Sequence, residues 1–344
     1  MTSMQVSVLR GVGEVAVEER SVPEPSPDEV LVQVGSVGVC GSDVHYYEHG
    51  RIGPYVVDSP LVLGHEAGGV ITAVGAEVTS LQVGQRVSIE PGVPCRSCPQ
   101  CLHGRYNLCP DVRFFATPPY DGAFAQYVSM PAAFVYAVPD SISDDAAGLI
   151  EPLSVGVWAC RRAELAPGST VLVTGAGPIG LIAAQTARAY GADSVTVTDV
   201  NSHRLDLARR LGLNVIDVST TSMAEADLEP DVLLECSGNA RATWDAVSCM
   251  ARAGRVVLVG MGGDTVQLPL SYVQDRELVI TGAFRYANTW PIAIQLAASG
   301  RVDLDAMVTG HFGLHEVEAA LAASRTDPTA VKVIVRPGDG DRWS

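Results

Sequence analysis

Residues 169–199 read STVLVTGAGPIGLIAAQTARAYGADSVTVTD, and this stretch decides the fold of the second half of the chain. A short apolar run (169–175) leads through a glycine-rich turn into a helical pattern (177–191), and a second apolar run (194–199) follows. The order strand, turn, helix, strand predicts one βαβ unit of a parallel sheet. Gly191, at the end of the helical pattern, is a typical helix C-cap.

The turn carries three glycines in the pattern G-x-G-x-x-G, which is typical of a dinucleotide site. Gly175 permits the tight turn, Gly177 lets a pyrophosphate approach the backbone, and Gly180 lets the helix pack on the strand. The phosphates would lie at the positive N-terminal end of that helix. The predicted cofactor-binding residues are Gly175, Gly177, Pro178, Ile179, Gly180, Asp199 and Arg204.

Two of these residues bear on the choice between NAD and NADP. Asp199 ends the second strand, where an acid can bind both ribose hydroxyls of NAD and would repel the 2′-phosphate of NADP. Arg204 leaves NADP open, because a basic residue nearby could accept that phosphate. The place of Asp199 at the strand end favours NAD.

The alternation of strand and helix continues toward the C-terminus. A helix (203–212) and three strands (231–238, 254–263 and 277–284) follow, which predicts a doubly wound parallel sheet. Beyond it lie two helical patterns (290–300 and 314–325) and a strand (330–337) that could rejoin the N-terminal part.

The N-terminal part has a different pattern. Residues 1–90 contain short alternating strands separated by glycines and prolines, such as 29–39, 68–75 and 85–90. They predict a small all-β unit, a barrel or a sandwich. Another strand-like run (123–130) and one helical segment (143–162) precede the parallel part. The fold class is therefore α/β, with a separate β-rich domain.

Composition excludes several kinds of partner. The chain has 344 residues, which suggests about two domains, and 47% of them are hydrophobic. The formal charge is 23 − 39 = −16, so we expect no nucleic-acid partner. The N-terminus does not resemble a secretory signal, and no apolar stretch reaches the roughly 18 residues of a membrane span. We therefore expect a cytoplasmic protein without a membrane partner.

Four of the eight cysteines crowd into the segment 91–110. Their spacing is Cys95-x2-Cys98-x2-Cys101-x7-Cys109. Four thiolates around a tetrahedral Zn²⁺ make a closed structural site that leaves no position for a substrate. The spacing predicts such a site in a small lobe, with an iron–sulfur cluster or free thiols as the alternatives.

Other candidate metal ligands lie far apart. CGSDVH (40–45) follows a strand, GHEAGG (64–69) begins the next one, and Glu151 lies in IEPLSVGVWA (150–159). Spacing alone does not join these segments into a site.

Their surroundings resemble a known family. GHEAGGVITAVGAEV (64–78) matches the zinc signature of the zinc-dependent medium-chain dehydrogenase/reductase superfamily. Three other segments resemble its sorbitol/xylitol, or polyol, branch: CGSDVHYYEHGRIG (40–53), RFFATPPYDGAFAQY (113–127) and FRYANTW (284–290). The resemblance covers essentially the whole chain.

The resemblance implies a domain organisation. A GroES-like domain would comprise residues 1–152 and 288–344, with the structural zinc lobe at 91–110. A Rossmann NAD-binding domain (153–287) would be inserted, with substrate and zinc in the cleft between the domains. It also implies a homotetramer.

The same resemblance implies a catalytic zinc. Its ligands would be Cys40, His65 and Glu66, with water as a further ligand, while Glu151 would bind the metal directly or through that water. Asp43 would orient His65. A second set of residues would move the proton: Ser42, His45 and Glu151.

The substrate contacts are also carried over from the polyol branch. They are Tyr46, Phe115, Thr117, Arg285 and Tyr286, whose guanidinium and hydroxyls suit a polyhydroxylated chain. The implied reaction interconverts a polyol secondary alcohol and its ketose with NAD. A threonine- or amino-cyclitol-type dehydrogenase is the first alternative, and a non-catalytic dinucleotide-binding relative is the second.

Overall fold

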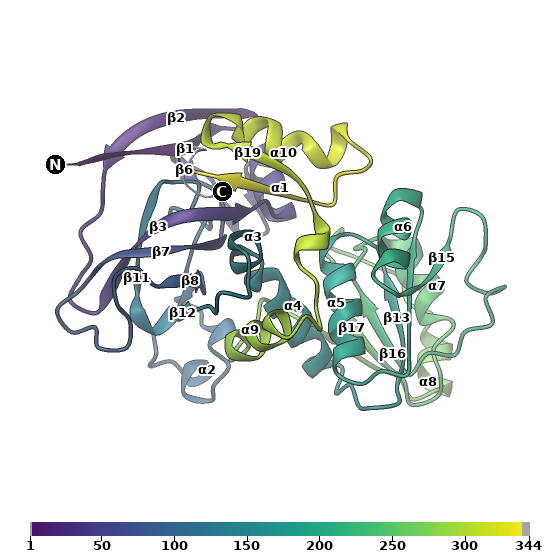
Figure 1. Ribbon diagram of the computed structural model, residues 1–344. Coiled ribbons are helices and arrows are strands. Elements are labelled where there is room, and N and C mark those ends of the chain that lie inside the picture. Colours follow the sequence, from purple (N-terminus) through teal and green to yellow (C-terminus); the bar gives the residue numbers. More distant parts are fainter. Residues whose placement is uncertain (1, 339–344) are drawn as a thin grey trace. The chain divides into compact units, whose positions relative to one another are not determined.

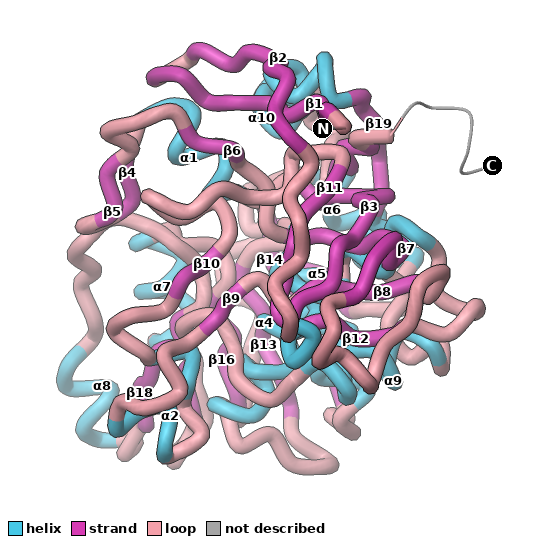
Figure 2. The backbone as a smooth tube through the Cα atoms, turned by 90° about the vertical axis from the view of Figure 1, so that its left-hand side faces the viewer, coloured by secondary structure: helices cyan, strands magenta, loops and turns pink. Residues whose placement is uncertain are grey.

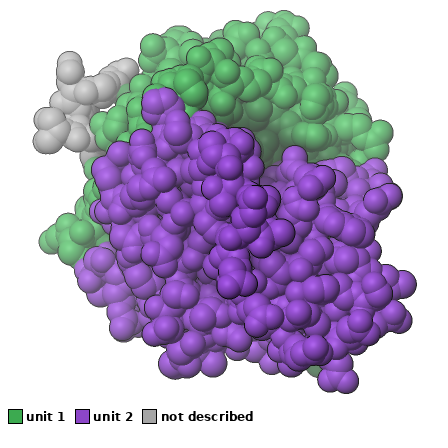
Figure 3. All heavy atoms as spheres, turned by 90° about the vertical axis from the view of Figure 1, so that its right-hand side faces the viewer, with its two compact units in different colours: residues 1–151, 304–344 green, residues 152–303 purple. Residues whose placement is uncertain are grey.

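Strand β3 (Glu29–Gly38) is the centre of the N-terminal part in the computed structural model, which describes residues 2–338. By its internal contacts the chain divides into a first unit (residues 1–151 and 304–344) and a second unit (residues 152–303), coloured separately in Figure 3. None of the described helices has the length and apolar character that crossing a membrane requires.

The first unit is built mainly from antiparallel strands. Seven of them form one sheet in the order β12-β8-β7-β3-β20-β19, with β11 also paired to β3. A second sheet has the order β2-β1-β6. The strands are β1 (Ser3–Gly11), β2 (Glu14–Ser21), β3, β4 (Arg51–Ile52), β5 (Tyr55–Val56), β6 (Leu61–Val62), β7 (Glu66–Val74), β8 (Arg86–Ile89), β9 (Gly92–Val93), β10 (Arg113–Phe114), β11 (Tyr127–Pro131), β12 (Val135–Ala137), β19 (Val308–Gly313) and β20 (Lys332–Arg336).

Apolar residues of these strands make the core of the first unit. Val30, Val32 and Val34 alternate along β3 and are fully buried, as the strand pattern of the sequence predicts. The helices of this unit are α1 (Gly41–His49), α2 (Pro99–Leu102), α3 (Asp144–Gly148) and α10 (Val317–Thr326). Figure 1 shows α10, in yellow, lying over the strands of this unit, where it contacts β19 and β20.

The second unit contains one six-stranded parallel sheet, in the order β15-β14-β13-β16-β17-β18. Its strands are β13 (Thr170–Thr174), β14 (Ser194–Asp199), β15 (Asn214–Asp217), β16 (Val232–Glu235), β17 (Arg255–Leu258) and β18 (Val279–Gly282). Its helices are α4 (Ile150–Arg162), which begins in the first unit, α5 (Pro178–Ala189), α6 (Ser202–Arg210), α7 (Ala240–Val247), α8 (Leu270–Asp275) and α9 (Trp290–Ala298). The predicted combination of a β-rich domain with a doubly wound sheet is confirmed.

Some details differ from the sequence patterns. The helical segment 143–162 consists of two helices, α3 and α4, which meet at Leu149. Strand β15 and helices α7 and α8 were not among the predicted elements. They are short, and short segments carry little periodicity to detect.

The chain returns to the first unit later than residue 288. Helix α9 belongs to the second unit by its contacts, and the first unit resumes at Leu304. The side chain of Trp290 is fully buried and packs edge-on against Tyr286, with ring centroids 5.1 Å apart, which anchors the start of this helix. The predicted last strand does rejoin the N-terminal part, because β20 pairs with β3.

Candidate active site and metal centres

Cys40, His65 and Glu66 lie together in the first unit. Their ligand atoms are all within 4.8 Å of one another. Cys40 is the N-cap residue of α1, and Glu66 is the first residue of β7. The fold thus brings together two of the three sequence segments that spacing alone did not join. A thiolate, an imidazole and a carboxylate fit zinc, and three protein ligands leave a coordination position open.

Asp43 ties the two ligand-bearing segments to each other. Its fully buried carboxylate accepts hydrogen bonds from the backbone N–H of Cys40 at 3.0 Å and of Gly64 at 2.9 Å. Its Oδ1 also lies 3.5 Å from Nδ1 of His65. This contact leaves Nε2 of His65 for a metal, the arrangement in which a carboxylate orients a ligand histidine.

The pKa values of His65 and Asp43 depend on each other's charge and on burial. Burial lowers the pKa of this imidazole, but the negative charges of Asp43 and Cys40 raise it well above its usual value. Burial likewise raises the pKa of Asp43, and the opposing contacts with His65 and with the backbone of Cys40 and Gly64 leave it lowered. The lowered pKa keeps Asp43 in its charged form, in which it can orient His65 toward a bound cation.

Lys332 is a member of this site that the sequence analysis missed. Its ammonium Nζ lies 2.7 Å from Oε1 of Glu66, and both side chains are buried. The signal in the sequence was a lysine inside the apolar run AVKVIVRP (330–337), since a charged residue in a buried strand needs a partner.

Glu151 is buried beside this site. It is not part of the three-residue ligand group, but its charge helps to raise the pKa of Lys332. Burial alone would lower the pKa of Lys332, but the negative charges of Glu66, Cys40 and Glu151 raise this pKa by more. Glu151 is thus close enough to act on the site electrostatically, and its contact with a metal remains a prediction.

The other predicted residues of the first unit lie on α1 and on the loop after β10. Ser42, His45 and Tyr46 are on α1, where His45 is exposed and Tyr46 is buried. Phe115 and Thr117 are half-buried. Phe114 is buried, and its ring lies 5.8 Å from that of His65, so it forms part of the wall of the ligand site.

Arg285 and Tyr286 belong to the second unit. Arg285 adopts a φ of 51° and Asn288 a φ of 56°, in the left-handed region that non-glycine residues rarely occupy. The Arg285 guanidinium lies over the ring of Phe284, and Tyr286 is buried against Trp290. Two such residues in one short loop indicate a backbone held in an unfavourable conformation, which is common at functional sites.

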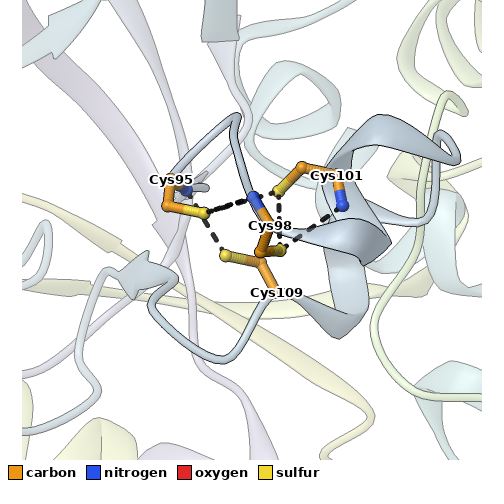
Figure 4. Close-up of side chains that lie close together, drawn as sticks. All are labelled: Cys95, Cys98, Cys101 and Cys109. Atoms are coloured by element: carbon orange, nitrogen blue, oxygen red, sulfur yellow. Dashed lines mark hydrogen bonds between the residues drawn. The ribbon is translucent and has the colours of Figure 1, made fainter.

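The four cysteines of the 91–110 lobe converge on one point (Figure 4). The Sγ atoms of Cys98 and Cys101 are 3.5 Å apart, and those of Cys95 and Cys101 are 4.0 Å apart. A tetrahedron with Zn–S bonds of about 2.3 Å has edges of about 3.8 Å, so one zinc ion fits these sulfurs. An iron–sulfur cluster would hold them further apart, because its own atoms lie between them.

Backbone and tertiary contacts shape this lobe. The N–H groups of Ser97 and Cys98 donate to the sulfur of Cys95 and lower its pKa to about 6, whereas burial raises the pKa of Cys101 to about 12. The antiparallel pair β9 and β10, side by side in Figure 2, closes the lobe at its base. The lobe is thus preorganised for one cation.

The glycine turn lies between β13 and α5. Gly175 has a φ of 84°, and a Cβ on Gly180 would collide with the carbonyl oxygen of Gly175. The space above Gly177 is open, and among the described residues no side chain caps the N-terminus of α5. A turn with free helix amides and open space above its middle glycine fits a pyrophosphate.

A cavity of about 270 Å³ opens beside this turn. Asp199 lines it and accepts hydrogen bonds from the backbone N–H of Ala176, Val200 and Asn201 at 2.7–2.8 Å. Arg204 is not among its lining residues, and its Nε is buried without a hydrogen-bond partner in the described part of the chain. The cavity therefore presents the carboxylate of Asp199, while Arg241, which also lines it, is paired with Asp245 at 2.6 Å. The lining residues are Thr174, Gly175, Thr198, Asp199, Val200, Val218, Met223, Ser237, Asn239, Arg241, Ala242 and Asp245.

A β-rich unit with an open metal-ligand group, in one chain with a parallel sheet and a dinucleotide turn, is the combination expected of a zinc-dependent dehydrogenase. Residues 26–140 match the alcohol dehydrogenase GroES-like domain, and residues 178–299 match the zinc-binding dehydrogenase family. The chain belongs to the zinc-dependent medium-chain dehydrogenases, in the branch that contains the sorbitol dehydrogenases.

Individual relatives cover nearly the whole chain. Sorbitol dehydrogenase of Bacillus subtilis is 43% identical, over 97% of this chain and 98% of its own. Sorbitol dehydrogenase of Gallus gallus is 45% identical, over 93% of this chain and 92% of its own. A protein of Sinorhizobium meliloti, solved with NADP and assigned to the zinc-binding dehydrogenases, is 30% identical with a TM-score of 0.92, over 98% of this chain and 100% of that one.

Proposed function

We propose that the protein interconverts a secondary alcohol of a small polyol and the corresponding ketose, with zinc and NAD as cofactors. The observation that carries the proposal is the open ligand group of Cys40, His65 and Glu66. It occurs in a chain whose full-length relatives are sorbitol dehydrogenases. The threonine-type and non-catalytic alternatives are not favoured by these relatives.

Zinc and NAD⁺ would supply the chemistry. Zinc bound to these ligands would act as a Lewis acid that lowers the pKa of the substrate hydroxyl, and NAD⁺ would accept the hydride. The chain's own residues hold and orient the reactants. Asp43 fixes His65, and Phe114 packs against the same imidazole, so the ligand geometry is set before any substrate arrives.

Ser42 and His45 are the residues we assign to proton removal. They are three residues apart on α1 and therefore lie on neighbouring positions of one helix face. His45 is exposed, so a proton that it receives from Ser42 can pass to water. Glu151 is the second candidate, because its buried carboxylate lies close enough to act on the charges of the site.

The polyol would be held by side chains that together offer several hydrogen bonds. We assign Tyr46, Phe115, Thr117, Arg285 and Tyr286 to this role. Each buried hydroxyl of a polyol needs a hydrogen-bond partner, and a guanidinium, phenols and a threonine hydroxyl supply several.

For the dinucleotide we propose NAD rather than NADP. Asp199 places a carboxylate in the cavity beside the glycine turn, where it would repel a 2′-phosphate, and Arg204 does not line that cavity. The remaining predicted contacts, Gly175, Gly177, Pro178, Ile179 and Gly180, would hold the pyrophosphate. The lobe of four cysteines would bind a second, structural zinc.

We also propose a cytoplasmic homotetramer. None of the eight cysteines, all of which lie in the described residues, forms a disulfide, and this fits a reducing compartment. Strand β18 ends the parallel sheet with one unpaired edge, and Val279 and Phe284 near it are 43% and 49% exposed. An apolar, unpaired edge is suited to pairing with a second copy. Light scattering coupled to size-exclusion chromatography measures the subunit number directly.

The test of the reaction is a rate panel with sorbitol, xylitol, ribitol and threonine, each with NAD⁺ and NADP⁺. We expect turnover of at least one polyol with NAD⁺ and its loss after treatment with a strong zinc chelator. Turnover of threonine but of no polyol would overturn the proposal.

Two matched cysteine variants separate the metal sites. Cys40→Ala should bind one zinc per chain instead of two and lose turnover, because it removes a ligand of the open site. Cys98→Ser should also bind one zinc, but it should lose mainly thermal stability. Metal content is measured by atomic emission. An unchanged zinc content in Cys40→Ala would contradict the assignment of the open site.

A further inference from the structure

The ion pair of Lys332 and Glu66 is the most deeply buried ion pair in the described part of the first unit. The lysine side chain is 2% exposed and the glutamate side chain 1% exposed. Nζ of Lys332 lies 2.7 Å from Oε1 of Glu66 and donates a second hydrogen bond to the carbonyl oxygen of Val39 at 2.9 Å. Lysine is almost never fully buried unless it is paired. The fold therefore accepts a costly charge at this position.

Strand β3 makes room for this pair. Its residue Gly38 is the cross-strand partner of Glu66 on β7 and of Ile334 on β20. Lys332 lies two positions from Ile334 and shares its face of the strand. A Cβ on Gly38 would collide with Oε2 of Glu66. Because Gly38 has no side chain, Lys332 on β20 can reach across β3 to Glu66 on β7.

The two oxygens of Glu66 have different surroundings. Oε1 is bound to Lys332, whereas Oε2 is buried and has no hydrogen-bond partner among the described residues. A buried, unsatisfied carboxylate oxygen is expensive, and a metal ion bound with Cys40 and His65 would satisfy it. Lys332 therefore leaves one oxygen of Glu66 for the metal.

We propose that Lys332 is a positioning residue that keeps Glu66 a weak, one-oxygen ligand of the catalytic metal. Its second hydrogen bond, to the carbonyl oxygen of Val39, holds the ammonium in place next to the ligand Cys40, which directly follows Val39. The inference rests on the proposed function, because it assumes that Cys40, His65 and Glu66 hold zinc. The ammonium offsets part of the carboxylate charge, so Glu66 donates less electron density and the metal remains a stronger Lewis acid.

A purely structural role of Lys332 predicts a different result for the metal. If the lysine only fills space and cancels a charge, its removal should disturb the site and weaken zinc binding. If it restrains Glu66, its removal frees both carboxylate oxygens, and the uncompensated charge is best neutralised by the metal itself. Zinc should then bind more tightly while turnover falls.

The experiment measures zinc affinity in full-length Lys332→Met, Lys332→Gln and Lys332→Arg by chelator competition. The affinity measured is that for the zinc ion that is missing from Cys40→Ala. We expect Lys332→Met to bind this zinc at least tenfold more tightly and to turn over at least tenfold more slowly, with Lys332→Gln intermediate. Lys332→Arg should restore both values to within about threefold. In the cobalt-substituted protein, the visible absorption bands should shift in Lys332→Met but not in Lys332→Arg.

The double variant Glu66→Gln/Lys332→Met provides the control, and it leaves no unpaired charge that could prevent folding. With Gln at position 66, replacement of Lys332 should change zinc affinity less than threefold. Weaker or unchanged zinc binding in Lys332→Met, or the same change in both backgrounds, would overturn the inference. Neither result would touch the proposed function, which instead fails if Cys40→Ala keeps both zinc ions.

Discussion

Asp43 and Asp199 illustrate how single residues can connect distant segments. Asp43 accepts hydrogen bonds from the backbone of Cys40 and of Gly64, and Asp199 accepts them from the turn after β13 as well as from its own loop. Each carboxylate is therefore held in place by backbone N–H groups, which do not change rotamer. The charge that each presents to a ligand is fixed before binding.

For Asp199 this gives a prediction about cofactor choice. Asp199→Asn keeps the size of the side chain but removes the charge that binds ribose hydroxyls and repels a 2′-phosphate. We expect kcat/KM for NAD⁺ to fall by 10- to 100-fold, which corresponds to about 1.5–3 kcal/mol for hydrogen bonds to a charged group. The kcat/KM for NADP⁺ should rise or stay constant, so that the ratio of the two kcat/KM values changes at least as much as the value for NAD⁺ alone.

Asp217 supplies the matched control. It is the cross-strand partner of Asp199 on β15, but it is not among the residues that line the cavity. Asp217→Asn should leave both kcat/KM values within about twofold. An equal loss in both variants would show that the effect comes from the sheet end and not from contact with the ribose.

At the residue scale, sequence patterns predicted the residues whose partners lie nearby in the chain. Gly175, Gly177 and Gly180 lie in one turn, where Gly175 has a positive φ, Gly177 leaves open space and Gly180 allows a close approach to the backbone. Lys332 could not be predicted in the same way, because its partner Glu66 is 266 residues away and only the sheet brings them together. Family resemblance assembled Cys40, His65 and Glu66, which spacing alone had left apart.

At the scale of elements, Glu90 links the cysteine lobe to the β-rich unit. This residue follows β8, is 1% exposed, and accepts hydrogen bonds from the hydroxyls of Tyr106 in the lobe at 2.7 Å and of Tyr136 on β12 at 3.0 Å. Burial raises the pKa of Glu90 to about 7, although the two tyrosine hydrogen bonds act to lower it. The anchor of the lobe therefore titrates near neutral pH.

The sign of the resulting pH dependence follows from linkage. The folded protein holds the Glu90 proton more tightly than the unfolded chain, whose carboxyl has the ordinary pKa of 4.5. The stabilisation is complete below that pKa and is lost as the pH rises through about 7. Glu90→Gln lacks this pH-dependent stabilisation. We therefore expect the difference in free energy of unfolding between Glu90→Gln and the wild type to change by up to about 3 kcal/mol in favour of the variant as the pH rises from about 5 to 8, as measured by thermal unfolding.

An exposed glutamate of the same unit serves as the control for this measurement. Glu77→Gln should shift the unfolding curves equally at every pH, because its carboxylate is exposed. Parallel curves for Glu90→Gln and the wild type would contradict the prediction. The pattern of the sequence did not indicate Glu90, since a single acid at a strand end is usually solvated.

The elements that sequence patterns located best are those with long apolar runs. Strands β13, β14, β16 and β17 and helices α5 and α6 were all expected close to where they lie. The break at Leu149 between α3 and α4 was not expected, although Gly148 directly precedes it and Pro152 lies in the first turn of α4.

At the scale of the whole molecule, the two units differ in the number of chain segments that form them. The second unit is one continuous segment, residues 152–303, with its own apolar core and its own cavity. The first unit needs two segments, because β19 and β20 complete the sheet that β3 begins. Removing β20 would leave Val37 and Gly38 of β3 without their antiparallel partner on that side.

This difference predicts the behaviour of fragments. Residues 152–303 expressed alone should fold, with cooperative thermal unfolding, and should bind NADH with a blue-shifted fluorescence signal but no zinc. Residues 1–151 alone should not fold, because they lack α10 and β20 of their core. A folded second-unit fragment that binds no NADH would contradict the placement of the dinucleotide residues. An unfolded one would contradict the independence of the unit.

The pairing of Glu66 with Lys332 also has a consequence for biosynthesis. A ribosome adds about 5–20 residues per second, so the 266 residues between the two partners take on the order of 10 to 50 s to make. During that interval the nascent chain already contains Cys40, His65 and Glu66 but not the lysine that restrains the carboxylate. A metal captured in this window meets an unrestrained ligand set, and the mature site is established only when the last strand of the sheet arrives.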